Sequence, residues 1–313
     1  MDIALAGACR LIDHGLIRAA GADAGTFLQG QLTNDVLSLG SAHGRLAGFC
    51  SAKGRLQASF IVWQAGPEEF LLACPVSVLA PTLKRLSMFV LRAKCKLSDA
   101  SEEVHLWGLA GASADAVLAD LPDWGRRGRD DGGTAIRLPD AAGVRRALVA
   151  ASAAAPAPDL ATAPTLSLDT WNWLAVQSGI VSIESATVDR FVPQMVNFER
   201  VGGVDFQKGC YPGQEVVARS QYRGTTKRRT FLFDSDAIPQ PGQDVFAGEE
   251  GGEPAGTVAN AAPRPDGQGG SALVELRLAA LDGPALRLGA ADGPLLRRVE
   301  LPYPPGLEAE TAG

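Results

Sequence analysis

Residues 191–229 (FVPQMVNFERVGGVDFQKGCYPGQEVVARSQYRGTTKRR) hold the densest group of side chains that can take part in chemistry. Within this segment Cys210 follows Lys208 by two positions and precedes a helix-compatible stretch, 213–219. Because proline is favoured at the first helical position, we expect the helix to begin at Pro212. The positive end of that helix and the Lys208 ammonium both favour a thiolate, which predicts a lowered pKa for Cys210. We therefore expect Cys210 to be the reactive group, assisted by Lys208; the alternative is a compact buried cysteine that closes a turn.

The other four cysteines, Cys9, Cys50, Cys74 and Cys95, lie in apolar strand-like or helical contexts, and we interpret them as structural. The five cysteines are widely spaced and odd in number, and no two of them form a CxxC motif. This pattern fits neither a disulfide framework nor a zinc or iron–sulfur ligand set. We therefore expect no metal site and a reducing, cytoplasmic environment.

Composition limits the classes of protein to which the chain can belong. Its 313 residues suggest about two domains, and 46% hydrophobic with 20% charged residues is typical of a globular protein. The formal net charge of −6 argues against nucleic-acid binding by the whole surface but is compatible with a local basic patch. The N-terminus lacks the basic segment of a signal peptide, and no apolar run reaches the roughly 18–20 residues of a membrane span. We expect a soluble protein without membrane contact.

The elements that must position Cys210 follow an irregular order of strands and helices, which predicts α+β layers rather than a doubly wound fold. A strand, a helix and a strand are expected between 94 and 150, and the Ala/Pro-rich stretch 150–165 is typical of a connector. From 230 onward, short β-like segments between Gly/Pro-rich turns indicate a small antiparallel barrel or sandwich. The remaining predicted strands are 11–17, 45–51, 56–64, 69–74 and 204–206, and the predicted helices are 24–30 (N-cap Asp23), 76–92 (despite Pro81) and 167–183.

Residues 206–215 (FQKGCYPGQE) resemble the K-G-C-Y-x-G-Q-E signature of the YgfZ-type folate-binding proteins, relatives of the aminomethyltransferase (T-protein) of the glycine cleavage system. Three further segments agree in chain order: 27–36 (FLQGQLTNDV) resembles Q-G-Q-x-T-x-D, 50–55 (CSAKGR) resembles C-x-x-K-G-[RK], and 191–194 (FVPQ) resembles F-[IV]-P-Q. The resemblance implies a folate-binding α+β body of mixed sheet and helices, with a ferredoxin-like middle part, closed by a C-terminal antiparallel β-barrel. We expect the body at 1–229, with a sub-division near 45–150, and the barrel at 230–313.

The resemblance also implies tetrahydrofolate, or a one-carbon derivative, as the cofactor. A reduced pterin needs convergent amide-like groups, an apolar slot and a basic mouth for its glutamate tail. Trp171, with Trp173, is a candidate aromatic wall, although such residues commonly serve core packing. We expect the basic residues of the 219–229 run to form this mouth; the alternative is that they lie on a solvent-exposed strand edge with no binding role. The cofactor-binding candidates are Gln29, Gln31, Thr33, Asp35, Trp171, Gln177, Tyr211, Gln214, Arg219 and Arg223.

Departures from the family patterns bear on the reaction. The T-protein has an aspartate that assists methylene transfer, whereas the corresponding stretch here, 53–63, contains no acidic residue. This disfavours a direct aminomethyltransferase and leaves open whether the chain is an enzyme. At Gln177 folate-binding relatives often carry a glutamate, and glutamine cannot form the charge-assisted pair. His14 stands where some relatives carry a stacking aromatic residue; its alternative is a local hydrogen bond.

Three hypotheses follow from the residues and the resemblance. The first is a tetrahydrofolate-binding accessory factor for the assembly or repair of iron–sulfur enzymes, including one that thiolates tRNA, with Cys210 as reactive thiol in one site with the folate slot. The second is a one-carbon transferase that uses a carboxylate, Asp35 or Asp205. The third is a non-catalytic module that binds tRNA or protein through the 219–229 run. We adopt the first, with folate and iron–sulfur client enzymes as partners and a tRNA contact left open.

Overall fold

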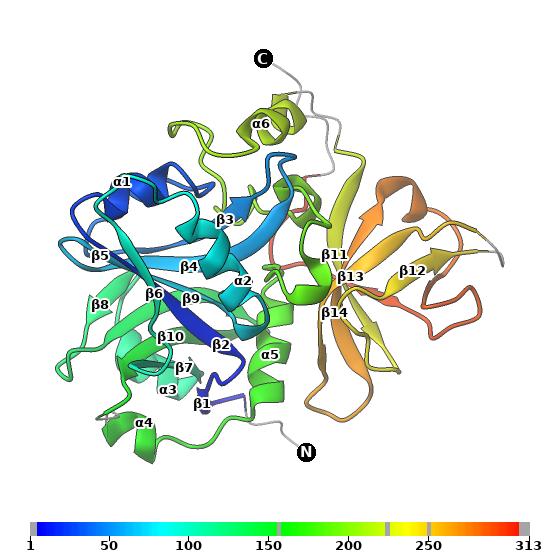
Figure 1. The fold of residues 1–313 in the computed structure, drawn as a ribbon. Helices are drawn as coiled ribbons and strands as arrows, with labels where there is room; N and C mark the ends of the chain where they lie inside the picture. The colour runs from blue at the N-terminus through cyan, green and yellow to red at the C-terminus, as the bar shows by residue number, and fades with distance from the viewer. Residues whose placement is uncertain (1–4, 155–157, 223–225, 249–251, 307–313) are drawn as a thin grey trace.

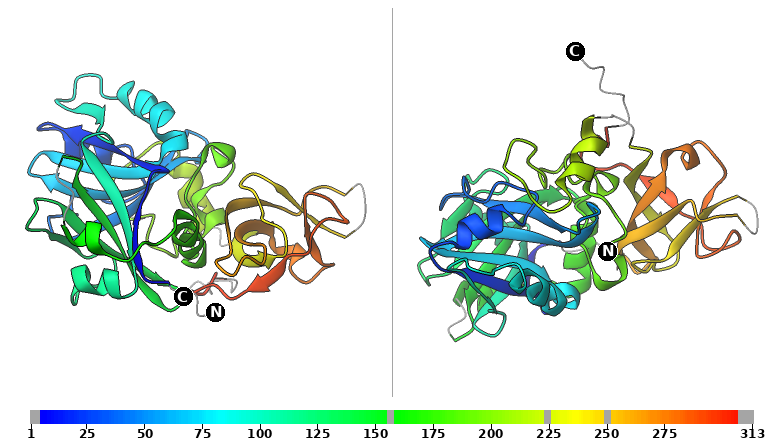
Figure 2. Two further views of the ribbon diagram at one scale, coloured as in Figure 1. Left: turned by 90° about the horizontal axis from the view of Figure 1, so that it is seen from below. Right: turned by 45° about the horizontal axis from the view of Figure 1, so that its top comes forward.

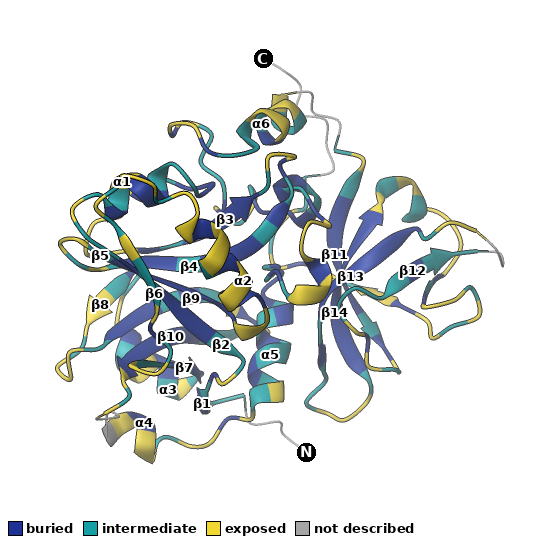
Figure 3. Ribbon diagram, viewed as in Figure 1, coloured by how far each residue is buried: buried dark blue, intermediate teal, exposed yellow. Residues whose placement is uncertain are grey.

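The computed structural model describes residues 5–154, 158–222, 226–248 and 252–306. Within these residues three antiparallel sheets organise the chain, two in the N-terminal body and one in the C-terminal part (Figure 1). Two further views show the C-terminal sheet set to one side of the body, with the helix of residues 168–177 between them (Figure 2). The strands are mostly buried, and exposed residues concentrate in loops and on the outer faces of helices (Figure 3).

The first sheet has the strand order β3-β4-β5-β2-β6. Two helices, α1 (Ala24–Gln29) and α2 (Val76–Ser87), pack on one face through an apolar cluster that includes Phe27, Phe60 and Leu79. The opposite face turns Leu16 and Trp63 toward the second sheet. The strands are β2 (His14–Ala20), β3 (Gly44–Cys50), β4 (Leu56–Gly66), β5 (Glu69–Pro75) and β6 (Lys96–Asp99).

The second sheet has the strand order β1-β7-β10-β9-β8 and buries both of its faces. Helix α3 (Ala112–Leu118) covers the outer face, and the short helix α4 (Pro158–Thr162) follows β10 in the chain. The inner face meets the first sheet and helix α5 (Leu168–Gln177). The strands are β1 (Gly7–Arg10), β7 (Val104–Ala110), β8 (Arg126–Gly128), β9 (Thr134–Ala141) and β10 (Val144–Ser152).

The C-terminal sheet, of order β15-β12-β13-β14-β11-β16, curls into a half-barrel around an apolar interior that includes Phe231, Val245 and Val258. Helix α5 joins it to the body, because the Trp173 indole Nε1 donates to Ser271 Oγ on β14 at 3.0 Å. The strands are β11 (Arg228–Ser235), β12 (Asp244–Ala247), β13 (Gly256–Pro263), β14 (Gly270–Arg277), β15 (Leu286–Leu288) and β16 (Arg297–Val299).

Helix α6 (Gln214–Tyr222) and three short 3₁₀ helices, η1 (Ser185–Thr187), η2 (Pro193–Val196) and η3 (Leu278–Ala280), lie outside the sheets. The predicted α+β fold with a C-terminal antiparallel β-structure is confirmed, and the strands predicted at 45–51, 56–64 and 69–74 correspond to β3, β4 and β5. The boundary at residue 229 stays a prediction.

Several local predictions are wrong. Residues 204–206 form no strand, and α6 begins at Gln214 rather than Pro212. The Asp23 carboxylate does not cap α1, because it accepts a hydrogen bond from the Lys94 amide at 2.7 Å. Helix α2 ends at Ser87, well short of residue 92. The connector 150–165 contains the end of β10 and α4, and its residues 155–157 lie outside the described residues.

Candidate functional site

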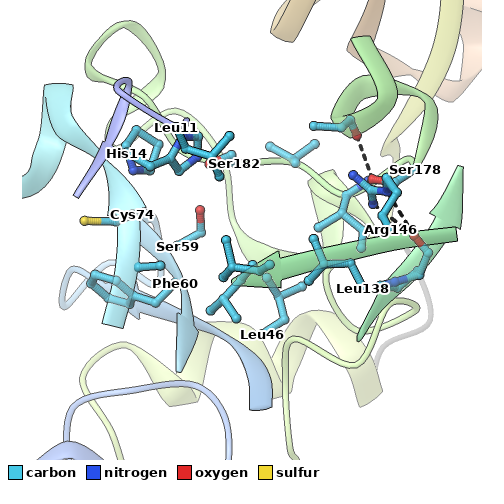
Figure 4. A pocket seen from close by; sticks show the side chains of 18 of the residues that line it. Leu11, His14, Leu46, Ser59, Phe60, Cys74, Leu138, Arg146, Ser178 and Ser182 are labelled. Atoms are coloured by element: carbon cyan, nitrogen blue, oxygen red, sulfur yellow. Dashed lines mark hydrogen bonds between the residues drawn. The ribbon is translucent and has the colours of Figure 1, made fainter. Parts of the chain in front are cut away.

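A cavity of about 110 Å³ lies between the inner faces of the two body sheets and is bounded by α5 (Figure 4). The first sheet contributes Leu46, Ser59 and Phe60 to the lining, and the second sheet contributes Leu138 and Arg146. An engineered cavity of about 150 Å³ binds benzene, so this space suits a small planar ring rather than a whole coenzyme. The lining is largely apolar with a few polar groups, which is the character of a small-molecule site.

One end of the cavity is polar because His14, Ser59 and Ser182 converge there (Figure 4). His14 Nδ1 lies 2.8 Å from Asp13 Oδ1, and Asn172 Nδ2 on α5 donates to Asp13 Oδ2 at 2.9 Å. Burial acts to raise the pKa of Asp13, but the hydrogen bonds from His14 and Asn172 outweigh it and hold that pKa below its ordinary value. With Asp13 as the acceptor, Nδ1 carries the proton of a neutral His14 and Nε2 is the acceptor.

The signature loop 206–213 is a second polar region, and its centre is Lys208. The Lys208 ammonium donates to the backbone carbonyl of Leu32 at 2.5 Å and to that of Gln29, and it lies 5.2 Å from the Tyr211 ring centre. Burial lowers the pKa of Lys208 to about 8, while Asp35, Asp205 and Cys210 act in the opposite direction. The structure therefore brings Lys208, Cys210 and residues of the 27–36 segment within electrostatic reach of one another.

Cys210 is exposed together with Gly209, and this exposed pair lies between the buried residues Lys208 and Tyr211. The thiol is thus presented to solvent by a loop whose flanks are fixed. The structure does not place it at the cavity: the lining contains no residue of the 206–213 loop. Cys210 and this cavity are therefore two separate places, and both the joint site with folate and the thiolate at Cys210 stay predictions.

Two motifs far apart in the sequence are in contact at this loop. Gly213 has a φ of +79°, and a Cβ there would lie 2.3 Å from the Ser51 carbonyl oxygen and 2.6 Å from the Gly54 backbone. Gly54 has a φ of +69°, and its Cβ would lie 2.8 Å from Val216 Cβ on α6. Both positions require glycine, because the left-handed conformation and the close backbone approach exclude a side chain. The signature loop therefore packs directly against the turn at residues 51–54.

The side chains of the 27–36 segment bond within that segment and to residues 48 and 203, close to this loop. Thr33 is fully buried, and its Oγ1 donates to the Gly203 carbonyl at 2.6 Å and accepts from the Gly48 amide at 2.7 Å. Gln29 Oε1 accepts from the Val36 amide at 2.7 Å, and Asp35 Oδ1 accepts from backbone amides that follow it.

These bonds fix the backbone of the 27–36 segment, whose Gln29 and Leu32 carbonyls accept from the Lys208 ammonium. Gln29, Gln31, Thr33 and Asp35 do not line the cavity, so folate contact by any of them stays a prediction.

Of the other candidates, only Trp171 lines the cavity. Its ring packs on Gly108, where a Cβ would lie 2.4 Å from it, so Trp171 also serves the core packing that was the alternative. Trp173 is turned toward β14 instead, and Gln177 is half-buried outside the lining. Tyr211 and Gln214 belong to the signature loop and the start of α6.

Three arginines of the 219–229 run that the structure describes are paired with carboxylates. Arg219 is exposed and pairs with Glu215 on α6 at 2.9 Å, whereas Arg228 and Arg229 form partly buried and buried ion pairs with Glu275 and Glu199. These pairs neutralise charges that a basic mouth or a tRNA contact needs. Arg223 lies outside the described residues.

Burial separates the remaining cysteines from Cys210. Cys9, Cys50 and Cys74 are buried and Cys95 is half-buried. Burial raises the pKa of Cys9 to about 11 and that of Cys50 and Cys74 to about 12. They are therefore unreactive near neutral pH, in agreement with their structural interpretation. Among the described residues no three His, Cys, Asp or Glu side chains form a metal-binding group, and no helix has the length and apolarity needed to span a membrane.

Arg146, Ser59 and Ser182 line the cavity but were not among the residues predicted from the sequence. Arg146 had a detectable signal: Arg145 and Arg146 are adjacent in a predicted strand region, and successive side chains of a strand point to opposite faces. One of the two had to point inward if both faces of that strand were covered. No signal in the sequence identified the serines.

Comparisons with known proteins agree with this geometry. The chain superimposes on the crystal structure of glycine cleavage system aminomethyltransferase T from Bartonella henselae with a TM-score of 0.74, covering 97% of this chain and 87% of that chain at 16% identity. The chain thus has the fold of the glycine cleavage aminomethyltransferase. No family model matches.

Sequence similarity identifies the family within that fold. The chain is 32% identical over 276 residues to the tRNA-modifying protein YgfZ of Escherichia coli O157:H7 (strain EC4115 / EHEC), which covers 82% of each chain. The same values hold for the tRNA-modifying protein YgfZ of Escherichia coli (strain K12). The chain belongs to the YgfZ family, which confirms the resemblance drawn from the signature.

Proposed function

We propose that this chain binds tetrahydrofolate, or a one-carbon derivative of it, and acts as an accessory factor for iron–sulfur enzymes that modify tRNA, with Cys210 as its reactive thiol. Membership of a family whose relatives are named tRNA-modifying proteins supports the tRNA context. The observation that carries the thiol assignment is the exposure of Cys210 on a loop anchored on both sides. A cysteine that serves packing alone would be buried rather than exposed on such a loop.

The central cavity is the proposed place for the pterin ring. Its apolar walls, formed by residues such as Leu46 and Leu138, suit the flat faces of a ring, and the polar groups of His14, Ser59 and Arg146 suit its edges. The volume of about 110 Å³ is smaller than the roughly 150 Å³ of a cavity that binds benzene, so the bicyclic ring would enter in part and the rest of the molecule would extend toward solvent. The function of these residues is to bind and orient the ring.

The signature loop is the proposed place of the thiol chemistry. Lys208 brings a positive charge within reach of Cys210, and the carbonyls of Gln29 and Leu32 hold its ammonium in place. A cation that is fixed next to a thiol favours its nucleophilic form. Lys208 acts only through its charge on Cys210, so we assign it a positioning role rather than a catalytic one.

The transferase and binding-module alternatives gain no support from the structure. The cavity lining contains no carboxylate, and Asp35 and Asp205 lie at the signature loop instead. Without a carboxylate at the ring, methylene transfer lacks a proton acceptor of the expected kind. Incubation with methylene-tetrahydrofolate and candidate amines is expected to give no turnover above background.

The proposal is tested in cells that lack the corresponding gene, with tRNA thiolation as the readout. Wild type and Cys95→Ser should restore thiolation, because Cys95 is a half-buried cysteine remote from the loop in sequence. Cys210→Ser should fail to restore it. Full restoration by Cys210→Ser would refute the thiol assignment.

A calorimetric titration with tetrahydrofolate tests the cofactor. Wild type is expected to bind, and Cys210→Ala is expected to bind with similar affinity, because Cys210 does not line the cavity. Absence of binding to wild type would refute folate as the cofactor. A large loss of affinity in Cys210→Ala would place the thiol and the ring in one site.

A further inference from the structure

Arg146 on β10 is a buried cation in the wall of the central cavity. Among the charged residues that the structure describes it is one of the least exposed, at 3% of its full exposure. Burial lowers the pKa of its guanidinium to about 10, and the charges of Asp140 and Asp123 offset this only in part. Both of those carboxylates pair with Arg137 instead, at 3.2 and 3.1 Å. Among the described residues Arg146 has no acidic ion-pair partner.

The hydrogen bonds of Arg146 leave one edge of the guanidinium unused. Nε and Nη2 donate to a single acceptor, the Pro139 carbonyl, at 3.1 and 3.0 Å (Figure 4). The guanidinium carbon lies 5.6 Å from the Trp171 ring centre, so the ring supports it from one side. Nη1, with its two N–H groups, donates to none of the described residues, and Arg146 is part of the cavity lining.

This arrangement is unfavourable for folding alone. Removing a charge from water is costly unless other charges and hydrogen bonds compensate, and replacing buried charged groups by apolar residues of similar size is often neutral or stabilising. The charge of the neighbouring Arg145 is compensated in the usual way, because this side chain points to the other face of the sheet and pairs with Asp115 at 3.0 Å. A buried Arg146 with a free donor edge is therefore explained by something other than stability.

We propose that Arg146 is a binding residue of the central cavity, where its Nη1 edge donates to an acceptor oxygen, carbonyl or anionic, on a planar heteroaromatic ring. The opposite polar end, with His14 and Ser59, then receives the far edge of the same ring. A ring that carries an acceptor oxygen at one edge is oriented in one direction only, because reversal would leave Arg146 unpaired. This inference rests on the proposed function and specifies which ligand group the cavity recognises.

The test compares Arg146→Met with the matched control Arg145→Met, in the full chain, by two measurements. The first is the melting temperature without ligand, and the second is the dissociation constant of tetrahydrofolate by calorimetry. We expect Arg146→Met to melt at or above the temperature of wild type and its dissociation constant to rise roughly 10- to 100-fold, the range of one charge-assisted hydrogen bond. Arg145→Met should leave the affinity unchanged.

Two results would overturn the inference: an affinity of Arg146→Met within about twofold of wild type, or a ligand-free melting temperature that falls by several degrees, which would show that Arg146 serves folding. Arg146→Lys is the second variant, because an ammonium lacks the planar fork that serves Pro139 and a ligand together. Wild-type affinity in Arg146→Lys would also contradict the inference. If wild type fails to bind tetrahydrofolate while Arg146→Met melts higher, the proposed cofactor is wrong and the buried donor remains assigned to another ring ligand.

Discussion

The contact between the 51–54 turn and the signature loop predicts a large effect of Gly213→Ala. Gly213 has a φ of +79°, a conformation that costs an alanine about 1–3 kcal/mol. The added Cβ would also lie 2.3 Å from the Ser51 carbonyl oxygen and 2.6 Å from Gly54 atoms. These neighbours are backbone atoms, so no side-chain rotation relieves the overlap. We expect Gly213→Ala to lower the free energy of unfolding by about 3 kcal/mol or more.

The same loop provides a matched control in Gly209→Ala. No heavy atom lies within 4 Å of a Cβ at Gly209, and its φ is not in the left-handed region. Its substitution should therefore change stability by at most about 1 kcal/mol in either direction. Urea-induced unfolding followed by circular dichroism measures both variants. If Gly213→Ala and Gly209→Ala unfold at the same urea concentration, the docking of the signature loop on the 51–54 turn is not as inferred.

Three further predictions concern the charges and thiols around the site. Burial lowers the pKa of Lys208 from 10.5 to about 8 in the folded chain, so between these two pH values the unfolded chain binds more protons than the folded chain. The free energy of unfolding of wild type should therefore rise from pH 8 toward 10 relative to that of Lys208→Met, as measured by urea unfolding across pH. Glu199→Ala leaves the buried Arg229 without its carboxylate and should lower the free energy of unfolding by about 3–5 kcal/mol. Glu215→Ala removes an exposed ion pair with Arg219 and should lower it by less than about 1 kcal/mol; thermal melts of both variants test this difference. In native protein a thiol reagent should modify Cys210 first, and mass spectrometry of Cys210→Ala should show no fast labelling.

Local patterns in the sequence predicted the elements with strong periodicity and turn signals. The strands β3, β4 and β5 were predicted because apolar residues and turns such as Lys53-Gly54 mark them directly. The strand predicted at 204–206 failed because its residues bond to the 27–36 segment: the Asp205 amide donates to the Thr33 carbonyl at 3.0 Å, outside any ladder. A tertiary partner of that kind has no local signature.

The two tryptophans show where elementary helix geometry was enough to refine the prediction. Residues two apart on a helix lie on nearly opposite sides, so Trp171 and Trp173 cannot form one wall. Trp171 accordingly lines the cavity, while Trp173 bonds to Ser271 on the C-terminal sheet. Which of the two faces inward depends on how α5 packs between the sheets, and the sequence does not contain that information.

The cavity and the signature loop are separate, but one element of the fold reaches both. In the hairpin of β3 and β4, Leu46 and Ser59 line the cavity, and the turn between the strands supports Gly213. Asn34 Nδ2 adds a direct link, because it donates to the Leu46 carbonyl at 2.7 Å and to that of Gly202 at 2.6 Å.

Residues 202–208 are bonded in turn to the 27–36 segment. Thr33 Oγ1 donates to the Gly203 carbonyl at 2.6 Å, and the Lys208 ammonium donates to the Leu32 carbonyl at 2.5 Å. The wall of the cavity and the base of the signature loop are therefore parts of one hydrogen-bonded framework built around β3 and the 27–36 segment.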